Sequence, residues 1–261
     1  MVRNARGVDY ETALRPVVAI GNDYAPNHLV RAHRHPLRSQ VLYVASGLAA
    51  VTTGDGAWVV PRERSLWIPL GVEHEIRGVG RYSTHSLFIE PSAVADMPGH
   101  CQVLGATPLM QALLQEAVDL PLEYDPDGRD ALIMALLLAE LRRLPALPLS
   151  LPFPRQAPLA ARCRAFLAAP TARVEIDDWS QAMGMSRSAF TRLFRRETGL
   201  SFAAWRQQAC ALAALPRLSA GEPVTGVALD LGYESPAAFT TMFKRVLGEP
   251  PSRYFAASQA L

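Results

Sequence analysis

The C-terminal part of the chain contains one pattern twice: residues 176–205 read IDDWSQAMGMSRSAFTRLFRRETGLSFAAW, and residues 224–254 read VTGVALDLGYESPAAFTTMFKRVLGEPPSRY. Four positions of the first copy recur 49 residues later: Phe190, Phe194, Gly199 and Trp205 correspond to Phe239, Phe243, Gly248 and Tyr254. Upstream, the offset is 48: Ile176, Trp179, Met183 and Gly184 recur as Val224, Val227, Leu231 and Gly232. Each copy predicts a short helix, a glycine turn and a second helix, which is a helix-turn-helix unit in tandem.

In the first copy we expect a supporting helix over 176–183, with Asp177 and Asp178 near its positive end. Ser186 is the expected N-cap of a second helix that runs to about Thr198. The spacing of Phe190, Leu193 and Phe194 turns these three residues inward. The residues left on the outer face, which can enter a DNA major groove, are Arg187, Ser188, Thr191, Arg192 and Arg195.

In the second copy, Pro223 opens a helix that Gly232 ends, and Ser235 followed by Pro236 marks the next helix start. The outer face of that second helix carries Ala237, Ala238, Thr240, Thr241 and Lys244. This face offers contacts to thymine methyls and phosphates but few hydrogen bonds to bases. Between the copies, residues 202–218 predict one connecting helix that Pro216 ends or kinks early.

Charge is unevenly distributed along the 261 residues. Residues 1–154 hold 13 arginines against 16 acidic residues, whereas residues 155–261 hold 13 basic residues against eight acidic ones. The basic half is the half with the repeat, which suits contact with phosphates. No apolar run approaches the roughly 20 residues that span a bilayer, and the N-terminus lacks an apolar leader block, so we expect a cytoplasmic protein. The three cysteines show no metal-binding spacing.

The N-terminal part predicts short strands separated by glycine and proline. Segments 40–44, 49–53, 57–60, 65–68 and 85–89 are apolar or β-branched, and this pattern predicts an antiparallel barrel or sandwich. Two helices follow, over about 107–119 and 128–144. The second is apolar on nearly every side, so we expect a homodimer formed through it, with Leu137 on the contact face.

Five prolines fall within residues 145–158, a density that no helix or central strand tolerates. We therefore expect a two-domain α+β protein: a β-barrel with helices at 1–144, an extended linker at 145–157, and an all-helical DNA-binding domain at 158–261.

Three histidines and a glutamine stand out in the N-terminal domain. His33 and His35 form an H-x-H pair, Gln40 follows, and His74 ends a P-x-G-x-x-H segment. Imidazole suits Zn, Cu, Fe and Ni, and an amide oxygen is a weaker further ligand. These side chains predict a divalent metal site, a pocket for a small organic ligand, or both. The alternative is that the three histidines line a pocket, or are satisfied buried side chains, in a barrel that binds no metal.

The C-terminal motif resembles the signature of the AraC/XylS family of bacterial transcription regulators over residues 158–257. The matching residues are Gly232, Tyr233, Glu234, Ser235, Phe239, Phe243, Lys244, Gly248, Pro250, Pro251 and Tyr254. The resemblance implies about seven helices and two recognition helices in successive major grooves. It also implies base reading by Ser188, Thr191 and Arg192 in the first unit, and by Ala237, Ala238 and Thr241 in the second. The small residues of the second unit predict that the first carries more of the sequence discrimination.

Residues 27–90 resemble the two motifs of the cupin barrel. In that family two histidines, an acid and a later histidine converge on one metal. Gln40 stands where the acid usually lies, and Glu63 stands where a glycine usually opens the second motif. The amide removes a negative charge, so metal affinity should fall.

The sequence favours a ligand-responsive transcription regulator without catalytic residues, whose partners are duplex DNA, a small effector, a second copy of the chain and RNA polymerase. A metal-dependent cupin enzyme fused to a DNA-binding domain is the first alternative, which the missing carboxylate at Gln40 disfavours. A DNA-architectural protein without effector is the second, which the barrel histidines disfavour.

Overall fold

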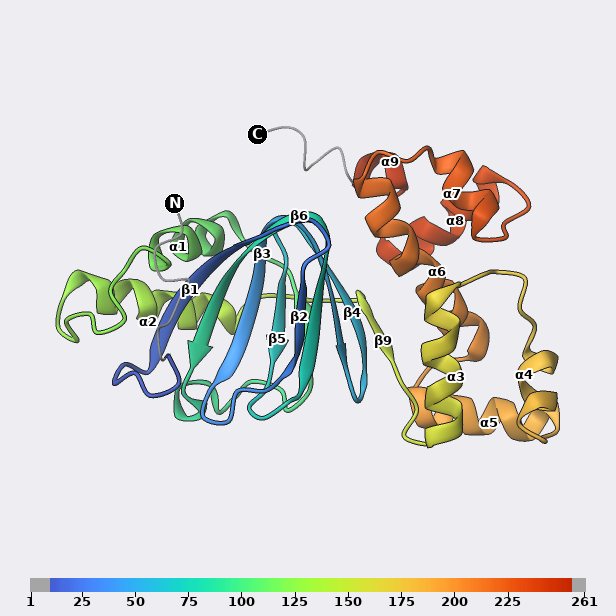
Figure 1. Cartoon of the computed structure of the whole chain (residues 1–261), viewed down its shortest axis with the longest axis horizontal. Helices are drawn as coiled ribbons and strands as arrows, with labels where there is room; N and C mark the ends of the chain where they lie inside the picture. Colours follow the sequence, from blue (N-terminus) through green and yellow to red (C-terminus); the bar gives the residue numbers. More distant parts are fainter. Residues whose placement is uncertain (1–9, 255–261) are drawn as a thin grey trace. The chain divides into compact units, whose positions relative to one another are not determined.

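The computed structural model describes residues 10–254 and divides into two compact units (Figure 1). The first comprises the chain up to Thr53 and from Trp58 to Leu147, and the second comprises Gly54–Ala57 and the chain from Pro148 onward. Residues 255–261, at the end of the expected DNA-binding domain, and residues 1–9 lie outside the described residues.

The first unit is built on an antiparallel sheet, as predicted. Its strands are β1 (Val17–Tyr24), β2 (Leu29–His33), β3 (Ser39–Thr53), β4 (Gly56–Pro61), β5 (Ser65–Ile68), β6 (His74–Ile89), β7 (Gln102–Leu104) and β8 (Ala146–Leu147). The main path runs β1-β6-β3-β5-β7-β8, with β2 also paired to β6 and β4 to β3. The expected strands 40–44 and 49–53 are both parts of β3.

β3 and β6 pair along most of their length and bend together. The first half of β3 pairs with the second half of β6, and the pairing shifts between Val44 and Leu48 before it continues to Thr53 and His74. Gly47 lies in this bend with φ +73°, and a Cβ there would be 2.4 Å from the Arg81 carbonyl oxygen. Glycine is therefore required where the sheet turns over, which Figure 1 shows as the arch of β6.

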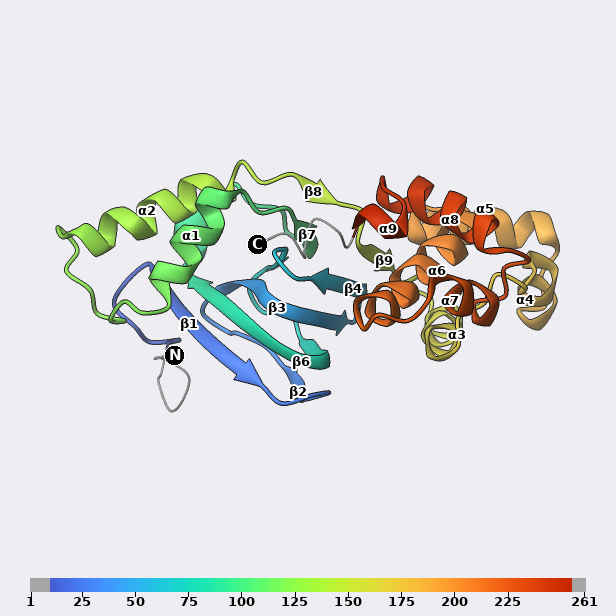
Figure 2. The same ribbon diagram turned by 90° about the horizontal axis from the view of Figure 1, so that it is seen from above.

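Helices cover one face of the sheet (Figure 2). These are α1 (Pro108–Ala117) and α2 (Arg129–Leu141), and the short 3-10 helix η1 (Pro91–Val94) precedes them. Val41 and Leu87 of the sheet pack with Met110 of α1 and Leu137 of α2 in one apolar core. The opposite face of the same strands carries Gln40, Ser86 and Phe88, as alternation along a strand requires.

The expectation that Leu137 lies on an exposed contact face is wrong. Met134, Leu137 and Leu141 are buried against the sheet core because they share one face of α2. The large apolar residues that α2 exposes are Leu132, at 70% of its surface, and Leu136, at 42%.

The expected linker contains two short extended elements. Ala146 pairs with Leu104 at the edge of the first unit, where proline neighbours do no harm to the sheet. In the second unit, Ser150–Pro152 forms β9, and the Phe153 N–H then donates to the Asp55 carbonyl (2.8 Å).

The second unit is helical throughout its main part. Its helices are α3 (Ala157–Ala168), α4 (Ile176–Ala182), α5 (Arg187–Thr198), α6 (Phe202–Ser219), α7 (Val224–Asp230), α8 (Pro236–Leu247) and α9 (Pro251–Tyr254). Ser186 and Ser235 cap α5 and α8 as predicted, accepting from Ala189 N and Ala238 N. Among the described residues, no helix is long and apolar enough to cross a bilayer.

Pro216 does not end α6 early, although an early end was one of the two outcomes expected from the sequence. The helix continues to Ser219, and Ala220 N–H donates to the Pro216 carbonyl at 3.0 Å. A proline removes only its own N–H from the helix, and the buried Leu215 and Leu218 hold the last turn in the core.

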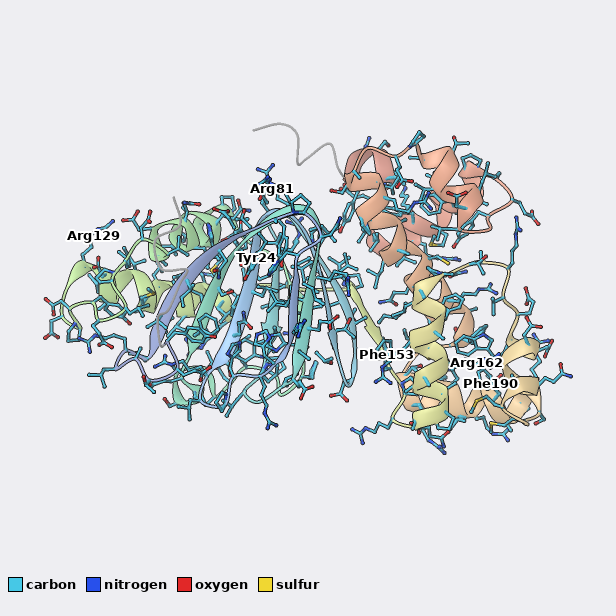
Figure 3. The ribbon with its side chains drawn as sticks, in the orientation of Figure 1. Tyr24, Arg81, Arg129, Phe153, Arg162 and Phe190 are labelled. Atoms are coloured by element: carbon cyan, nitrogen blue, oxygen red, sulfur yellow. The ribbon has the colours of Figure 1, made fainter. Side chains whose placement is uncertain are left out.

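Aromatic rings form the centre of the first helix-turn-helix unit. Trp179 of α4 lies 5.0 Å from Phe202 and 6.5 Å from Phe190 between ring centroids, and Phe190 and Phe194 are fully buried. Figure 3 labels Phe190 together with Arg162, whose guanidinium lies 5.3 Å from the Trp179 ring. Ring packing thus fixes the inner face of α5, and its outer face is exposed.

Candidate functional site

The sheet brings His33, His35 and His74 together. His33 ends β2 and pairs with His74 at the start of β6, while His35 follows two residues after β2. One ring nitrogen from each histidine lies within 4.8 Å of the others. His35 and His74 are buried and His33 is half-buried. The convergence that the H-x-H pair and the later histidine suggested is present.

Backbone carbonyls fix two of the three rings. His33 Nδ1 lies 2.8 Å from the Arg31 oxygen, and His74 Nδ1 lies 2.9 Å from the Val72 oxygen. A carbonyl oxygen only accepts, so both Nδ1 atoms carry the proton and both Nε2 atoms present a lone pair. His74 Nε2 is buried, and no described residue gives it a hydrogen-bond partner. A buried lone pair without a partner needs an explanation, and a bound ion is one that fits a nitrogen facing two other imidazoles.

His35 is held by side chains instead. Its Nδ1 lies 2.9 Å from Glu11 Oε1, and its Nε2 lies 3.2 Å from Gln40 Oε1. If the neutral ring donates its Nδ1–H to Glu11, its Nε2 carries a lone pair. This lone pair faces the Gln40 oxygen, which is also an acceptor. A half-turn of the Gln40 amide would relieve this repulsion, and so would a cation bound by both atoms. Gln40 Nε2 also donates to Ser86 Oγ at 3.1 Å.

Burial favours the neutral form of His35 and His74. The pKa of His74 is lowered to about 4, chiefly because burial disfavours the charged ring, while its hydrogen bond to Val72 acts in the opposite direction. The pKa of His35 is also lowered, again mainly by burial, and the Glu11 carboxylate opposes the shift. Neutral imidazole is the form that binds a metal, so both rings are ready to bind at neutral pH.

A segment before β1 lies over the cluster. Tyr10 stacks on Phe88 with ring centroids 3.8 Å apart, and its hydroxyl lies 3.5 Å from His35 Nδ1. Arg38, only 2% exposed, donates to the Ala13 carbonyl at 2.6 Å and to the Arg15 carbonyl at 3.0 Å. Sequence reasoning missed Glu11, Tyr10, Arg38 and Ser86, because no motif connects them to the histidines.

The donor set fits a divalent transition metal. Zinc–imidazole bonds measure about 2.0–2.1 Å, so adjacent nitrogens of a tetrahedral site lie roughly 3.3 Å apart. The three nitrogens, which now lie within 4.8 Å of one another, would have to approach to about this separation to hold the ion. The hydrogen bonds from the Nδ1 atoms to two carbonyls and a carboxylate are the outer contacts that orient metal-bound histidines.

The outer face of α5 is exposed, as predicted. Arg187, Ser188, Thr191, Arg192 and Arg195 are all exposed. Arg187 donates to Asp177 Oδ2 of α4 at 2.9 Å, and Arg192 donates to Ser188 Oγ at 2.7 Å. The exposed Arg196 next to this face was not singled out from the sequence.

The outer face of α8 is poorer in polar groups. Ala237, Ala238, Thr241 and Lys244 are exposed, whereas Thr240 is half-buried rather than fully outward. Arg245, which sequence reasoning did not select, is exposed beside Lys244. The two helices therefore present different chemistry to a partner: guanidinium and hydroxyl groups on α5, and methyl groups followed by two cations on α8.

Both units match known families. Residues 15–147 match the family model of the AraC-like ligand binding domain, and residues 179–257 match that of a helix-turn-helix domain. The chain is 34% identical over 224 residues to the HTH-type transcriptional regulator NimR of Escherichia coli strain K12, covering 86% of this chain and 81% of NimR. The chain belongs to the AraC family of transcription regulators. Its second unit is the DNA-binding domain and its first the ligand-binding domain of such a regulator.

Two further likenesses are narrower or weaker. The HTH-type transcriptional regulator RipA of Corynebacterium glutamicum is 30% identical over 114 residues, which are 43% of this chain and 33% of RipA. The crystal structure of ToxT from Vibrio cholerae O395 has 11% identity and a TM-score of 0.40 over 94% of this chain and 99% of that one. That degree of structural similarity is too low to carry an argument about function.

Proposed function

We propose that His33, His35 and His74 are the effector site of this regulator and hold a divalent transition metal there. The observation that carries the proposal is the buried, unpartnered Nε2 of His74, facing two other imidazoles whose nitrogens lie within 4.8 Å. Structural packing alone gives no reason to bury the imidazoles of His35 and His74 side by side, with a third imidazole next to them.

The proposed site has room for a second ligand. Three imidazoles are neutral donors, so a bound divalent ion would keep its charge and at least one open position. Such an ion attracts oxygen donors and anions, and this suits a small organic effector. Gln40, whose oxygen lies 3.2 Å from His35 Nε2, is the described side chain best placed to be a further, weaker ligand.

For DNA recognition we assign the two exposed helix faces. Ser188, Thr191 and Arg192 of α5 supply the hydrogen-bonding groups that read base edges, with Arg187 and Arg195 on the flanks. On α8, Ala237, Ala238 and Thr241 contact thymine methyls, while Thr240 and Lys244 support the backbone contacts. The first helix-turn-helix unit therefore carries more of the sequence discrimination. In this assignment residues 1–144 sense, 145–157 connect, and 158–261 bind DNA.

We further assign the exposed face of α2 to a homodimer. Leu132 and Leu136 expose more than two fifths of their surface, and Leu109 of α1 exposes 46%. An exposed leucine face on a sensor domain suits a second copy of the same chain, because each copy then covers the other. As a regulator the dimer would act in the cytoplasm, where the DNA is, and contact RNA polymerase.

The histidine site serves sensing rather than catalysis in this proposal. A metal-dependent cupin enzyme would use the same donors, but Glu11, the acidic group in contact with the cluster, is bonded to His35 Nδ1 and to Leu37 N. It orients a ring and is not placed to move a substrate proton.

Metal binding by purified protein tests the proposal. The full-length chain is stripped with chelator and dialysed against Zn²⁺, Ni²⁺, Co²⁺ or Mn²⁺, and bound metal is counted per chain. We expect one ion per chain for wild type, near zero for His74→Ala, and the wild-type value for His100→Ala, an exposed control. Equal metal content in wild type and His74→Ala would overturn the assignment.

A further inference from the structure

The two helix-turn-helix units contain the same glycine turn in different surroundings. Gly184 and Gly232 have φ +64° and +78°. Each donates to a carbonyl three residues earlier at 2.9 Å, and the residue after each donates to a carbonyl five residues earlier, Met185 to Ser180 at 2.9 Å and Tyr233 to Ala228 at 3.0 Å. The turns are thus equivalent in conformation and in hydrogen bonding.

Their environments differ. A Cβ built on Gly184 would meet nothing within 4 Å. A Cβ on Gly232 would lie 2.4 Å from Thr171 Oγ1 and 3.0 Å from Arg173 Cγ. The Ala172 N–H also donates to the carbonyl of Leu231 at 2.8 Å. Residues 171–173 precede the first helix-turn-helix unit. They are therefore docked on the glycine turn of the second helix-turn-helix unit.

The docked segment leads directly into the first unit. Glu175, three residues after Ala172, caps α4 with a reciprocal pair of bonds to Asp178. Arg206 of the connecting helix α6 donates to the Val174 carbonyl and lies 3.9 Å from Glu175. Figure 1 shows this segment passing from α3 to α4. The start of α4 is thus fixed to the turn of the second unit by a very short stretch of chain.

We propose that residues 171–173 form a spacing clamp between the two units: by docking on Gly232 they fix the separation of α5 and α8, and so the distance between the DNA segments that one chain accepts. This inference rests on the proposed assignment of both helices to DNA. One inserted base pair moves the second segment by about 3.4 Å and turns it by about a tenth of a helical turn. A clamped pair of units cannot follow that shift, whereas a loosened pair can.

The matched glycines give the test. Duplexes selected from a random library by the wild-type full-length chain are remade with one base pair inserted between the two protected segments, and the affinity ratio of the two duplexes is measured. We expect a ratio of roughly tenfold for wild type, in the range of a base-pair mismatch. Gly184→Ala, which strains its turn without meeting another segment, should keep this ratio. Gly232→Ala should reduce it to less than threefold.

Two more variants separate the clamp from general damage. Thr171→Ala removes the atom nearest to the new methyl, so Thr171→Ala with Gly232→Ala should restore most of the ratio. Insertion of two glycines between Arg173 and Val174 lengthens the tether without touching the Gly232 turn, and should lower the ratio even if Gly232→Ala does not fold.

A wild-type chain that binds both duplexes equally would contradict the assignment of both helices to DNA. A wild-type ratio that Gly232→Ala and the glycine insertion leave unchanged would overturn the clamp alone.

Discussion

Glu11 Oε1 lies 2.9 Å from His35 Nδ1, and 24 residues separate the two along the chain. This contact joins the segment before β1 to the histidine cluster. The carboxylate accepts a hydrogen bond from the ring Nδ1–H, which leaves the lone pair on Nε2 of His35. Its second oxygen accepts from Leu37 N at 3.1 Å. Glu11 is therefore a positioning residue for the proposed metal site.

Glu11→Gln should weaken metal binding by roughly 10- to 100-fold, the usual effect of removing an outer partner of a histidine ligand. The amide keeps the size of the side chain but loses the charge that favours His35 as a ligand. Calorimetric titration with the metal that wild type binds measures the change. Glu73→Gln removes the same charge from an exposed position beside His74 and should change affinity by less than threefold. If the two variants behave alike, Glu11 acts only through its charge at a distance.

Arg192→Ala should cost about 1–3 kcal/mol of binding free energy on the selected operator and relax the preference at one base position. The guanidinium fork can pair with guanine O6 and N7, and Ser188 Oγ, 2.7 Å from Arg192 Nη1, holds it along the helix. Thr241→Ala on α8 should cost less. Fluorescence anisotropy with operator and random duplexes measures both. An equal loss on the two duplexes would show that Arg192 contacts phosphate instead.

Leu136→Glu should raise the dimer dissociation constant at least tenfold, because association would bury a carboxylate in an apolar contact. Sedimentation equilibrium at micromolar concentration measures the change, and Leu132→Glu should act in the same way. Leu229→Glu alters an exposed leucine of α7 and should leave the dimer intact. A wild-type chain that is already monomeric at these concentrations would remove the α2 interface from the account.

Acid should destabilise the metal-free protein partly through His85, which is not one of the proposed ligands. Burial lowers the pKa of His85, while Asp23 and Asp119 oppose the shift, and its Nδ1 has no hydrogen-bond partner among the described residues. The unfolded chain takes up the proton near pH 6.5, whereas folded His85 takes it up only at lower pH. His85 therefore costs no stability above pH 6.5, and the free energy of unfolding decreases as the pH falls below that value.

Urea unfolding in chelator at pH 7, 6 and 5 measures this loss. His85→Gln should lose less stability on acidification than wild type, and the exposed His100→Gln should follow the wild-type curve. Parallel curves for wild type and His85→Gln would show that His85 takes up its proton equally in both states.

The tandem helix-turn-helix was predictable because its signals are local. Serine caps, glycine turns and the Phe-x-x-x-Phe spacing each depend on neighbouring residues, and the structure has α4, α5, α7 and α8 where they predict them. The histidine cluster was predictable only through the resemblance to the cupin motifs, because His33 and His74 are distant in the sequence. Glu63 stands where cupins usually have glycine, and its φ of +62° lies in the left-handed region that favours glycine. The local conformation is thus retained although the residue type differs.

The remainder depends on contacts between distant segments. Nothing near His35 in the sequence points to Glu11 or Tyr10, and nothing in the apolar helix 128–144 says which leucines face the sheet. The expectation that Leu137 faces a partner is wrong because nearly every side of that helix is apolar. Periodicity therefore cannot choose which leucines face the sheet. The difference between Gly184 and Gly232 is likewise invisible in two nearly identical repeats, since it arises from residues 171–173.

The central claim is that a metal held by His33, His35 and His74 controls DNA binding. The most direct test is the affinity of the metal-stripped full-length chain for its selected operator duplex, measured by anisotropy as Zn²⁺, Ni²⁺ or Co²⁺ is added. The account predicts that at least one ion changes the affinity of wild type by fivefold or more, a typical coupling between two sites, and that of His74→Ala by less than twofold. An unchanged wild-type affinity with every ion, or an equal change in His74→Ala, would contradict it.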